Sequence, residues 1–175
     1  MTQHPLNKFR FCPVCGSPLW TINNEKSKHC GQCGFVYYAN PSASVAAFIQ
    51  NKNGDLLVCR RGREPAKGTL DLPGGFVDMD ETIENALRRE IKEELNLSII
   101  DVTYVQSIPN LYLYSGMTIH TIDFLFKCNV ENLESMKAGD DVSEAFFKPL
   151  NIISPYEFGL ESIKKGIIAF LKSIK

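Results

Sequence analysis

Residues 72–97 read LPGGFVDMDETIENALRREIKEELNL, and this stretch decides how the rest of the chain is interpreted. Its second half carries apolar residues at helical spacing, which predicts a helix from Thr82 to Leu95 with Asn96 as its stop. Its first half is a turn-rich loop that contains Pro73, Gly74 and Gly75. A glycine loop followed by an amphipathic helix is therefore the first expected element of the fold.

The acidic residues of this predicted helix stand in an unusual place. At about 100° per residue, the apolar stripe that begins near Ile83 runs directly into three carboxylates, those of Glu90, Glu93 and Glu94. A solvated acidic face would be the ordinary interpretation if these groups lay opposite the stripe. Like charges on a half-buried face repel one another and lose hydration, and divalent cations offset both costs. Clustered oxygen ligands favour Mg²⁺ or Mn²⁺.

Neighbouring residues have an ordinary and a functional interpretation. Arg89 either forms a surface salt bridge with Glu93, one turn away, or fixes the orientation of a carboxylate. Glu81 starts the helix, where the helix dipole favours an acid in any case. Gly74 and Gly75 form either a plain turn or a place where backbone groups approach a metal or phosphate closely.

The whole pattern resembles the Nudix box, the signature of hydrolases that act on nucleoside diphosphates linked to another moiety. The matching residues are Gly75-x5-Glu81-x7-Arg89-Glu90-Ile91-x-Glu93-Glu94-x-Asn96-Leu97. Asn96 stands where the family usually has glycine, but Asn also tolerates left-handed backbone, so the helix can still end there. Two looser family preferences also differ, at Leu70 and at Asp78.

This resemblance implies an α/β/α sandwich with a mixed sheet, in which the box forms a loop, a helix and a second loop. It implies that Mg²⁺ or Mn²⁺ is bound by Glu90, Glu93 and Glu94, together with the carbonyl of Gly74. It further implies that residues 142–150 form a late strand. The residues it implies for catalysis are Glu93, Glu94 and Glu144, with Arg89 and Glu81 as orienting groups and with Asp140 and Asp141 as rivals of Glu144 for the base.

Four of the six cysteines form two Cys-x2-Cys pairs, namely Cys12, Cys15, Cys30 and Cys33. Each pair is followed by glycine, which permits the left-handed backbone of a zinc knuckle, and four thiolates suit a closed, structural zinc site. Disulfides or a redox dithiol are the alternative, which the missing secretion signal disfavours. His29 is interpreted as a surface residue, and Cys59 and Cys128 as small core residues.

Asn40-Pro41 marks the expected boundary between a zinc ribbon, residues 1–40, and a Nudix domain, residues 41–175. Strands are predicted at residues 44–49, 56–59, 102–107, 119–128 and 145–147, with a hairpin at Asn53-Gly54. A capping motif at residues 154–157 precedes a helix whose apolar stripe runs from Leu160 to Ile174. Strands mixed with two helices indicate a layered α/β fold.

Composition limits the classes of partner. With 19 Lys and Arg against 20 Asp and Glu, no global field selects nucleic acid or an anionic membrane. No apolar run approaches the roughly 20 residues of a membrane span, and the first residues lack the apolar core of a signal peptide. A cytoplasmic protein with a small nucleotide substrate is expected.

The resemblance implies metal-dependent cleavage of a pyrophosphate bond with release of a nucleoside monophosphate. An N-terminal four-cysteine ribbon before the box resembles the arrangement of NADH pyrophosphatases, yet residues 106–112 lack the tryptophan of their motif. ADP-ribose and dinucleoside polyphosphates stay open as substrates. Tyr112 and Tyr114 are either substrate contacts or, as preferred, ordinary strand packing.

Two functions of other classes are weighed against hydrolysis. A non-catalytic Nudix nucleotide sensor would be favoured by loss of the box carboxylates, which are all present. A nucleic-acid adaptor role for the ribbon would use its few basic and aromatic residues. A structural or homodimer-forming ribbon is the preferred interpretation.

Overall fold

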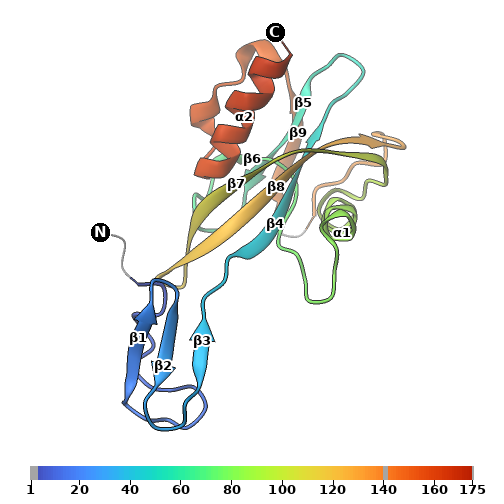
Figure 1. Ribbon diagram of the computed structural model, residues 1–175. Coiled ribbons are helices and arrows are strands. Elements are labelled where there is room, and N and C mark those ends of the chain that lie inside the picture. Colours follow the sequence, from blue (N-terminus) through green and yellow to red (C-terminus); the bar gives the residue numbers. More distant parts are fainter. Residues whose placement is uncertain (1–3, 140–141, 175) are drawn as a thin grey trace.

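The computed structural model describes residues 4–139 and 142–174, so Asp140 and Asp141 lie outside the described residues. The chain forms a small N-terminal ribbon followed by a larger unit of strands and two helices, with the ribbon extending from one end of that unit (Figure 1). The ribbon is an antiparallel sheet of β1 (Trp20–Asn24), β2 (Ser27–Cys30) and β3 (Val36–Tyr38). Its own small core contains Cys12, Trp20 and Cys30, with Phe35 packed against them.

The larger unit is built on two three-stranded sheets. In the first, β4 (Ser42–Ile49) runs parallel to β8 (Met117–Val130), which pairs antiparallel with β7 (Ile99–Tyr114). In the second, β5 (Leu56–Arg61) lies between β6 (Leu70–Asp71) and β9 (Val142–Lys148), and both pairings are antiparallel. The strands are therefore mixed in direction, as the sequence predicted.

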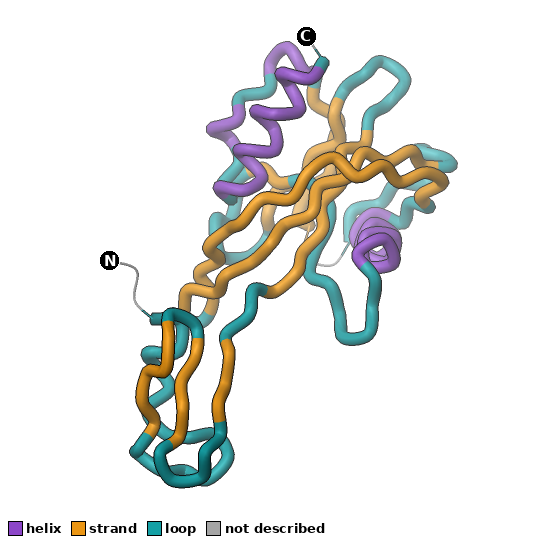
Figure 2. The backbone as a smooth tube through the Cα atoms, in the orientation of Figure 1, coloured by secondary structure: helices purple, strands orange, loops and turns teal. Residues whose placement is uncertain are grey.

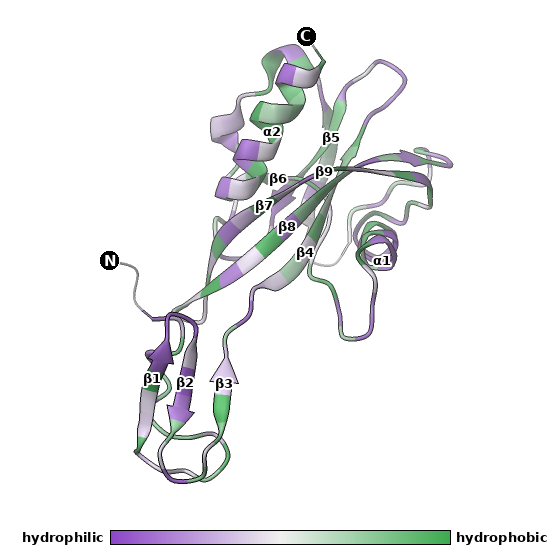
Figure 3. Ribbon diagram, in the orientation of Figure 1, coloured by the Kyte–Doolittle hydropathy of each residue, from purple (hydrophilic) through white to green (hydrophobic). Residues whose placement is uncertain are grey.

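Helices cover both faces of these strands, as the backbone tube shows (Figure 2). Successive side chains of β4 point to opposite faces of the sheet. Ala47 packs in the apolar cluster that includes residues of α1 (Ile83–Leu95), and Phe48 packs in the cluster that includes residues of α2 (Glu161–Ser173). The Phe48 ring stacks on Phe170 of α2 at a centroid distance of 4.4 Å. Apolar residues are concentrated where strands and helices face each other (Figure 3). This layering confirms the predicted α/β/α class.

The prediction of a hairpin at Asn53-Gly54 is wrong in its strand pairing. The turn itself exists, since Gly54 has a φ of 82° and donates from its backbone amide to the Asn51 carbonyl at 3.0 Å. Beyond a single bridge between Gln50 and Leu56, however, β4 and β5 enter different sheets. Each strand has a longer partner elsewhere, because β4 pairs with β8 over its whole length and β5 pairs with β9.

Strand β7 extends well beyond its predicted end at Ser107, through Pro109 to Tyr114. A proline is tolerated because β7 lies at the edge of its sheet, so the missing N–H removes no hydrogen bond to a further strand. The long β7–β8 hairpin closes at Ser115 and Gly116, which both have positive φ as a tight hairpin turn requires.

The C-terminal helix begins later than predicted. The capping box of Ser154 and Glu157 is present, but it opens only a single 3-10 turn at Pro155–Glu157. The chain then extends through Phe158, which is 1% exposed, and α2 starts at Glu161. Burial of Phe158 in the core outweighs continuation of the turn. Among the described residues no helix is long and apolar enough to cross a lipid bilayer.

Candidate active site

The glycine loop is fixed against β4. Backbone amides of Val45 and Ala47 donate to the carbonyls of Gly75 and Pro73 at 2.8 and 2.9 Å. Gly74 has a φ of 144°, and a Cβ placed there would lie 2.1 Å from the Val45 carbonyl oxygen. The carbonyls on either side of Gly74 are thus committed to β4, whereas within the described parts of the chain no hydrogen bond is found to the Gly74 carbonyl itself.

The loop also contacts the acidic face of α1. A carboxylate oxygen of Glu94 accepts a hydrogen bond from the Gly74 amide at 2.9 Å. At Gly75 an added Cβ would lie 2.5 Å from the nearest atoms of the Glu90 carboxylate. Glycine at this position therefore leaves the space into which the Glu90 side chain reaches.

Arg89 holds the surrounding acids in place. Its guanidinium forms a two-point pair with Glu81, at 3.0 and 2.8 Å, and also binds Glu90 at 2.8 Å and Glu93 at 3.2 Å. It donates further to the backbone carbonyl of Phe76 at 3.0 Å, which links the helix to the loop. Hydrogen bonds from Arg89 lower the pKa of Glu81 below its usual range, so Glu81 stays ionised as the fixed partner of the arginine.

The three carboxylates named by the sequence line one cleft but differ in environment. The Glu90 side chain is 16% exposed, and its burial raises the pKa of this carboxyl against the opposing effect of Arg89. The Glu93 side chain is 54% exposed and binds Arg89 through one of its two carboxylate oxygens. A half-buried acid, a carbonyl and two further carboxylates form a set of hard oxygen donors, which fits a divalent cation such as Mg²⁺ or Mn²⁺.

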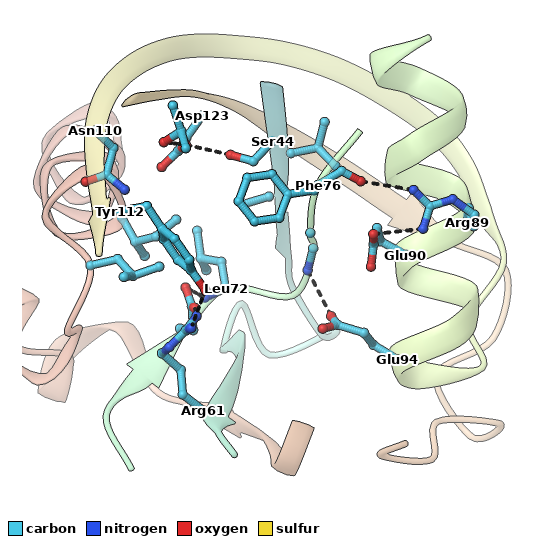
Figure 4. Close-up of a pocket in the computed structure, with 18 of the residues that line it drawn as sticks. Ser44, Arg61, Leu72, Phe76, Arg89, Glu90, Glu94, Asn110, Tyr112 and Asp123 are labelled. Atoms are coloured by element: carbon cyan, nitrogen blue, oxygen red, sulfur yellow. Dashed lines mark hydrogen bonds and ion pairs between the residues drawn. The ribbon is translucent and has the colours of Figure 1, made fainter. Parts of the chain in front are cut away.

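The cleft has a volume of about 400 Å³ and a second wall that faces α1 (Figure 4). On this wall the Arg61 guanidinium pairs with Asp71 at 2.5 Å and donates to the Tyr112 hydroxyl at 3.4 Å. Burial raises the pKa of Asp71 despite that partner. The Tyr112 ring meets Phe76 edge-on at a centroid distance of 5.6 Å. Tyr112 therefore lies in the cleft, whereas Tyr114 is 60% exposed.

Several lining residues were not singled out by sequence reasoning, namely Ser44, Asn110, Thr121 and Asp123. They come from three strands and belong to no compact motif. Asp123 does carry one signal, because it is an acid inside the otherwise apolar run of residues 122–126 and is 5% exposed. Acids are rarely buried without a specific partner or role, so this position could have been flagged.

Glu144 differs in its contacts from the other acids expected at the site. It sits on β9, where its carboxylate pairs with Arg60 at 3.0 Å, and its side chain is 56% exposed. It is not among the described residues that line the cleft.

The four paired cysteines converge. Their sulfur atoms lie within 4.8 Å of one another, with Cys12 and Cys33 at 3.7 Å and Cys15 and Cys30 at 3.6 Å. A tetrahedral zinc with Zn–S bonds of about 2.3 Å separates its sulfurs by roughly 3.8 Å. The donors and their spacing therefore fit zinc. Cys59 and Cys128 are buried in the core of the larger unit, as predicted.

Comparison with known proteins gives a consistent result. A family model described as a NUDIX domain matches residues 40–169. An ADP-ribose pyrophosphatase of Methanocaldococcus jannaschii is 38% identical over 130 residues, which is 73% of each chain. An NAD-capped RNA hydrolase, NudC, of Vibrio atlanticus is 27% identical over 121 residues, or 69% of this chain. The chain covers only 44% of that NudC protein.

A solved structure is also similar. The crystal structure of a NUDIX hydrolase from Nitrosomonas europaea aligns with a TM-score of 0.70, covering 94% of this chain and 91% of that one. Its sequence identity is 21%, so the likeness concerns the fold.

Proposed function

The chain belongs to the NUDIX family of hydrolases, and on this premise we propose that it cleaves the pyrophosphate bond of ADP-ribose or a closely related nucleoside diphosphate derivative. A divalent cation is required, and the expected products are a nucleoside monophosphate and a phosphorylated partner. The observation that carries the proposal is the meeting of Glu90, Glu93 and Glu94 with the Gly74-Gly75 loop in one cleft.

In this proposal the cation is Mg²⁺ or Mn²⁺, and its ligands are Glu90, Glu94 and the Gly74 carbonyl. Glu93, which the sequence also named as a ligand, is assigned instead to the base. Such an ion neutralises the phosphate oxygens and lowers the pKa of bound water. The protein's own contribution is orientation. Arg89 and Glu81 hold the carboxylates in position, since one guanidinium binds Glu81, Glu90 and Glu93 together.

A base must accept the proton of the attacking water. We assign this role to Glu93, because it lines the cleft and its side chain is more exposed than that of Glu90. Glu144 is a weaker choice, since it pairs with Arg60 and is not among the described residues that line the cleft.

ADP-ribose is the preferred substrate for two reasons. The Methanocaldococcus relative carries that activity in its name and matches over most of both chains. The NudC relatives match over less than half of their length, and this chain lacks the tryptophan after the box. Space also suffices, since a cleft of about 400 Å³ is within the usual range for small-molecule sites.

We also propose that residues 1–40 form a zinc ribbon distinct from a Nudix domain of residues 41–175. Four thiolates leave no open coordination position, so the zinc would be structural. It would stabilise a segment whose described apolar core is limited to a few residues around Trp20.

The decisive test incubates the purified protein with Mg²⁺ and a panel of ADP-ribose, NADH, dinucleoside polyphosphates, sugar nucleotides and nucleoside triphosphates. Chromatography of the products identifies both the preferred compound and the bond that is broken. Release of AMP from ADP-ribose with the highest kcat/KM is expected. Absence of turnover on the entire panel, with Mg²⁺ or Mn²⁺, would contradict the proposal.

A further inference from the structure

The end of the cleft opposite α1 contains a buried carboxylate held by three hydroxyl groups. One oxygen of Asp123 accepts hydrogen bonds from Ser44 Oγ at 2.5 Å and from Thr121 Oγ1 at 2.7 Å. The other oxygen accepts from Ser162 Oγ of α2. Asp123 is 5% exposed, and the pairing of β4 with β8 places Ser44 directly beside it.

These hydrogen bonds fix the direction in which each hydroxyl group donates its hydrogen. A serine or threonine hydroxyl has one hydrogen and two lone pairs. Because Ser44 and Thr121 give their hydrogens to Asp123, their oxygens can offer only lone pairs to a ligand. Both residues line the cleft together with Asp123, and Figure 4 shows Ser44 bonded to this carboxylate. Ser162, which bonds the other oxygen, is not among the described residues that line the cleft.

The charges at this end disfavour a phosphate group. Two carboxylates, those of Asp71 and Asp123, line it, and Arg61 is already paired with Asp71 at 2.5 Å. Among the described cleft-lining residues the only other cation is Arg89, which is bound to the acids of α1. A diphosphate is therefore expected beside α1, where the proposed divalent cation would neutralise it, and an uncharged part of the substrate at the Asp123 end.

Two further features fit an uncharged, polar ligand. Asn110 lines the same end, is 8% exposed, and has no side-chain hydrogen bond within the described parts of the chain. Its amide therefore offers a donor and an acceptor to a ligand. The rings of Tyr112 and Phe76 form an apolar surface alongside, suited to the face of a base or sugar.

We propose that Ser44 and Thr121 recognise hydrogen-bond donors on the nucleoside or ribose part of the substrate. Asp123 binds the hydrogens of both hydroxyl groups, so that their oxygens act as acceptors. The inference rests on the proposed function and adds to it the residues that select the substrate. Two groups of ADP-ribose carry such donors: the ribose hydroxyls and the amino group of adenine. Ser44 and Thr121 touch the ligand, and Asp123 acts through them as a positioning residue.

The test compares kcat/KM for ADP-ribose with that for three analogues, each lacking one donor. In two of them the 2-hydroxyl of one or the other ribose is replaced by hydrogen, and in the third unsubstituted purine replaces adenine, so that a hydrogen stands in place of the amino group. We expect the wild-type protein to disfavour at least one analogue by about 3- to 10-fold, the effect of one neutral hydrogen bond. That preference should disappear in Thr121→Val or Ser44→Ala, mainly through a higher KM for ADP-ribose.

Matched variants separate recognition from folding. Thr121→Ser keeps the hydroxyl and should restore the preference, and Ser173→Ala removes a hydroxyl at the far end of α2, where it bonds to the Phe170 carbonyl. Equal discrimination in wild type, Thr121→Val and Ser44→Ala would overturn the inference, as would equal use of all four compounds by the wild type. The analogue whose lower kcat/KM relative to ADP-ribose disappears in the variants identifies whether a ribose or the adenine is recognised.

A binding measurement separates failure of this inference from failure of the proposed function. Calorimetry with α,β-methylene ADP-ribose, which resists hydrolysis, reports recognition without turnover. Binding weakened by Thr121→Val and restored by Thr121→Ser supports the inference even if hydrolysis fails. Turnover of ADP-ribose with unchanged binding in Thr121→Val would leave the proposed function standing and overturn the inference.

Asp123→Ala gives a second test. Without the carboxylate, the hydroxyls of Ser44 and Thr121 lose the acceptor that binds their hydrogens, so these hydrogens can point into the cleft. The site would then favour acceptors, so the preference for adenine or hydroxyl donors should be lost or reversed. A variant that stays folded by its circular dichroism spectrum and keeps the wild-type order of the four compounds would contradict the positioning role.

Discussion

The carboxylate of Glu94 accepts a hydrogen bond from the backbone amide of Gly74 at 2.9 Å, and this contact ties helix α1 to the glycine loop. Twenty residues separate the two groups in the chain. The contact places a carboxylate oxygen beside the loop whose Gly74 carbonyl we propose as a further ligand. Helix and loop therefore act as one structural unit in the proposed site.

Glu94→Gln should abolish most activity while leaving the fold intact. A glutamine oxygen can still accept from the Gly74 amide, but the negative charge proposed to bind the cation is lost. We expect kcat with ADP-ribose to fall by about 100-fold or more, as happens when a group that stabilises the transition state is removed. Wild-type turnover with an unchanged Mg²⁺ dependence would contradict the assignment, and the unfolding temperature controls for misfolding.

Gly75→Ala tests how closely the loop and helix must approach. The added Cβ would lie 2.5 Å from the Glu90 carboxylate, so that side chain must move. Because Gly75 is not at positive φ, the loss should arise from displacement of Glu90 rather than from backbone strain. We expect at least a tenfold loss of kcat/KM, of the order seen when ligand orientation is disturbed.

Gly31→Ala is the matched control for that variant. A Cβ at Gly31 meets only ordinary contacts at 3.6 Å, within the ribbon. Activity should therefore be unchanged. A loss of equal size in both variants would show that Gly75 has no special relation to Glu90.

Helix α1 and its end were predictable because their signals are local. The Thr82 side chain caps the helix through the Asn85 amide, and Asn96 adopts left-handed backbone at a φ of 56°, as its place after the last apolar residue indicated. The carboxylate pattern depends only on helical spacing, so it too could be read from the sequence. Gly74 was expected to let its backbone approach a metal or phosphate closely. The group that lies closest to it in the structure is the backbone of Val45, in a strand that is distant in the sequence.

The opposite end of the cleft could not be predicted in the same way. Ser44, Asn110 and Thr121 are brought together only by the pairing of β4 and β7 with β8. Strand register depends on tertiary packing, which the local sequence does not specify. The predicted start of α2 was wrong for a similar reason. The cap at Ser154 was predicted correctly, but burial of Phe158 ended the turn.

Substitution of Cys33 by Ser should release the predicted zinc. The purified wild-type protein is expected to contain about one zinc per chain, because four thiolates complete a tetrahedral site. Cys33→Ser should reduce the zinc content and expose the Trp20 region to solvent, which tryptophan fluorescence would detect. Cys128→Ala, at a buried cysteine far from the cluster, should retain the metal. Equal zinc content in all three proteins would argue against the ribbon site.

Glu157→Gln should lower stability in a pH-dependent way. Hydrogen bonds from Lys148 and the Ser154 amide hold the pKa of Glu157 below its usual value. A depressed pKa means that the ionised form stabilises the fold above the unfolded-state pKa, and that this stabilisation is lost as the pH falls through the folded-state value. The unfolding temperature of Glu157→Gln should therefore lie below that of wild type at neutral pH, and the difference should shrink as the pH falls through the folded-state pKa of Glu157.

Glu161→Gln is the control for that pH series. Glu161 is a more exposed acid, and within the described ranges its ion pair is with Lys164 one turn along α2. Exposed pairs of this kind contribute little. Its unfolding temperature should stay close to that of wild type across the same range. A constant difference for Glu157→Gln at all pH values would mean that the carboxylate charge is irrelevant there.

Arg89→Lys tests whether one planar cation is needed to position the acids. The guanidinium binds Glu81 at two points and also reaches Glu90, Glu93 and the Phe76 carbonyl, whereas a lysine ammonium cannot satisfy this set at once. We expect kcat to fall by about 10- to 100-fold and the Mg²⁺ concentration for half-maximal activity to rise, as for loss of a group that orients metal ligands. Arg88→Lys is the neighbouring control, because Arg88 donates to the Ile99 carbonyl and does not line the cleft. A rise in the Mg²⁺ requirement of Arg89→Lys alone would show that the arginine positions the carboxylates. An equal loss of activity in both variants, with the same fall in unfolding temperature, would instead show an effect on helix stability.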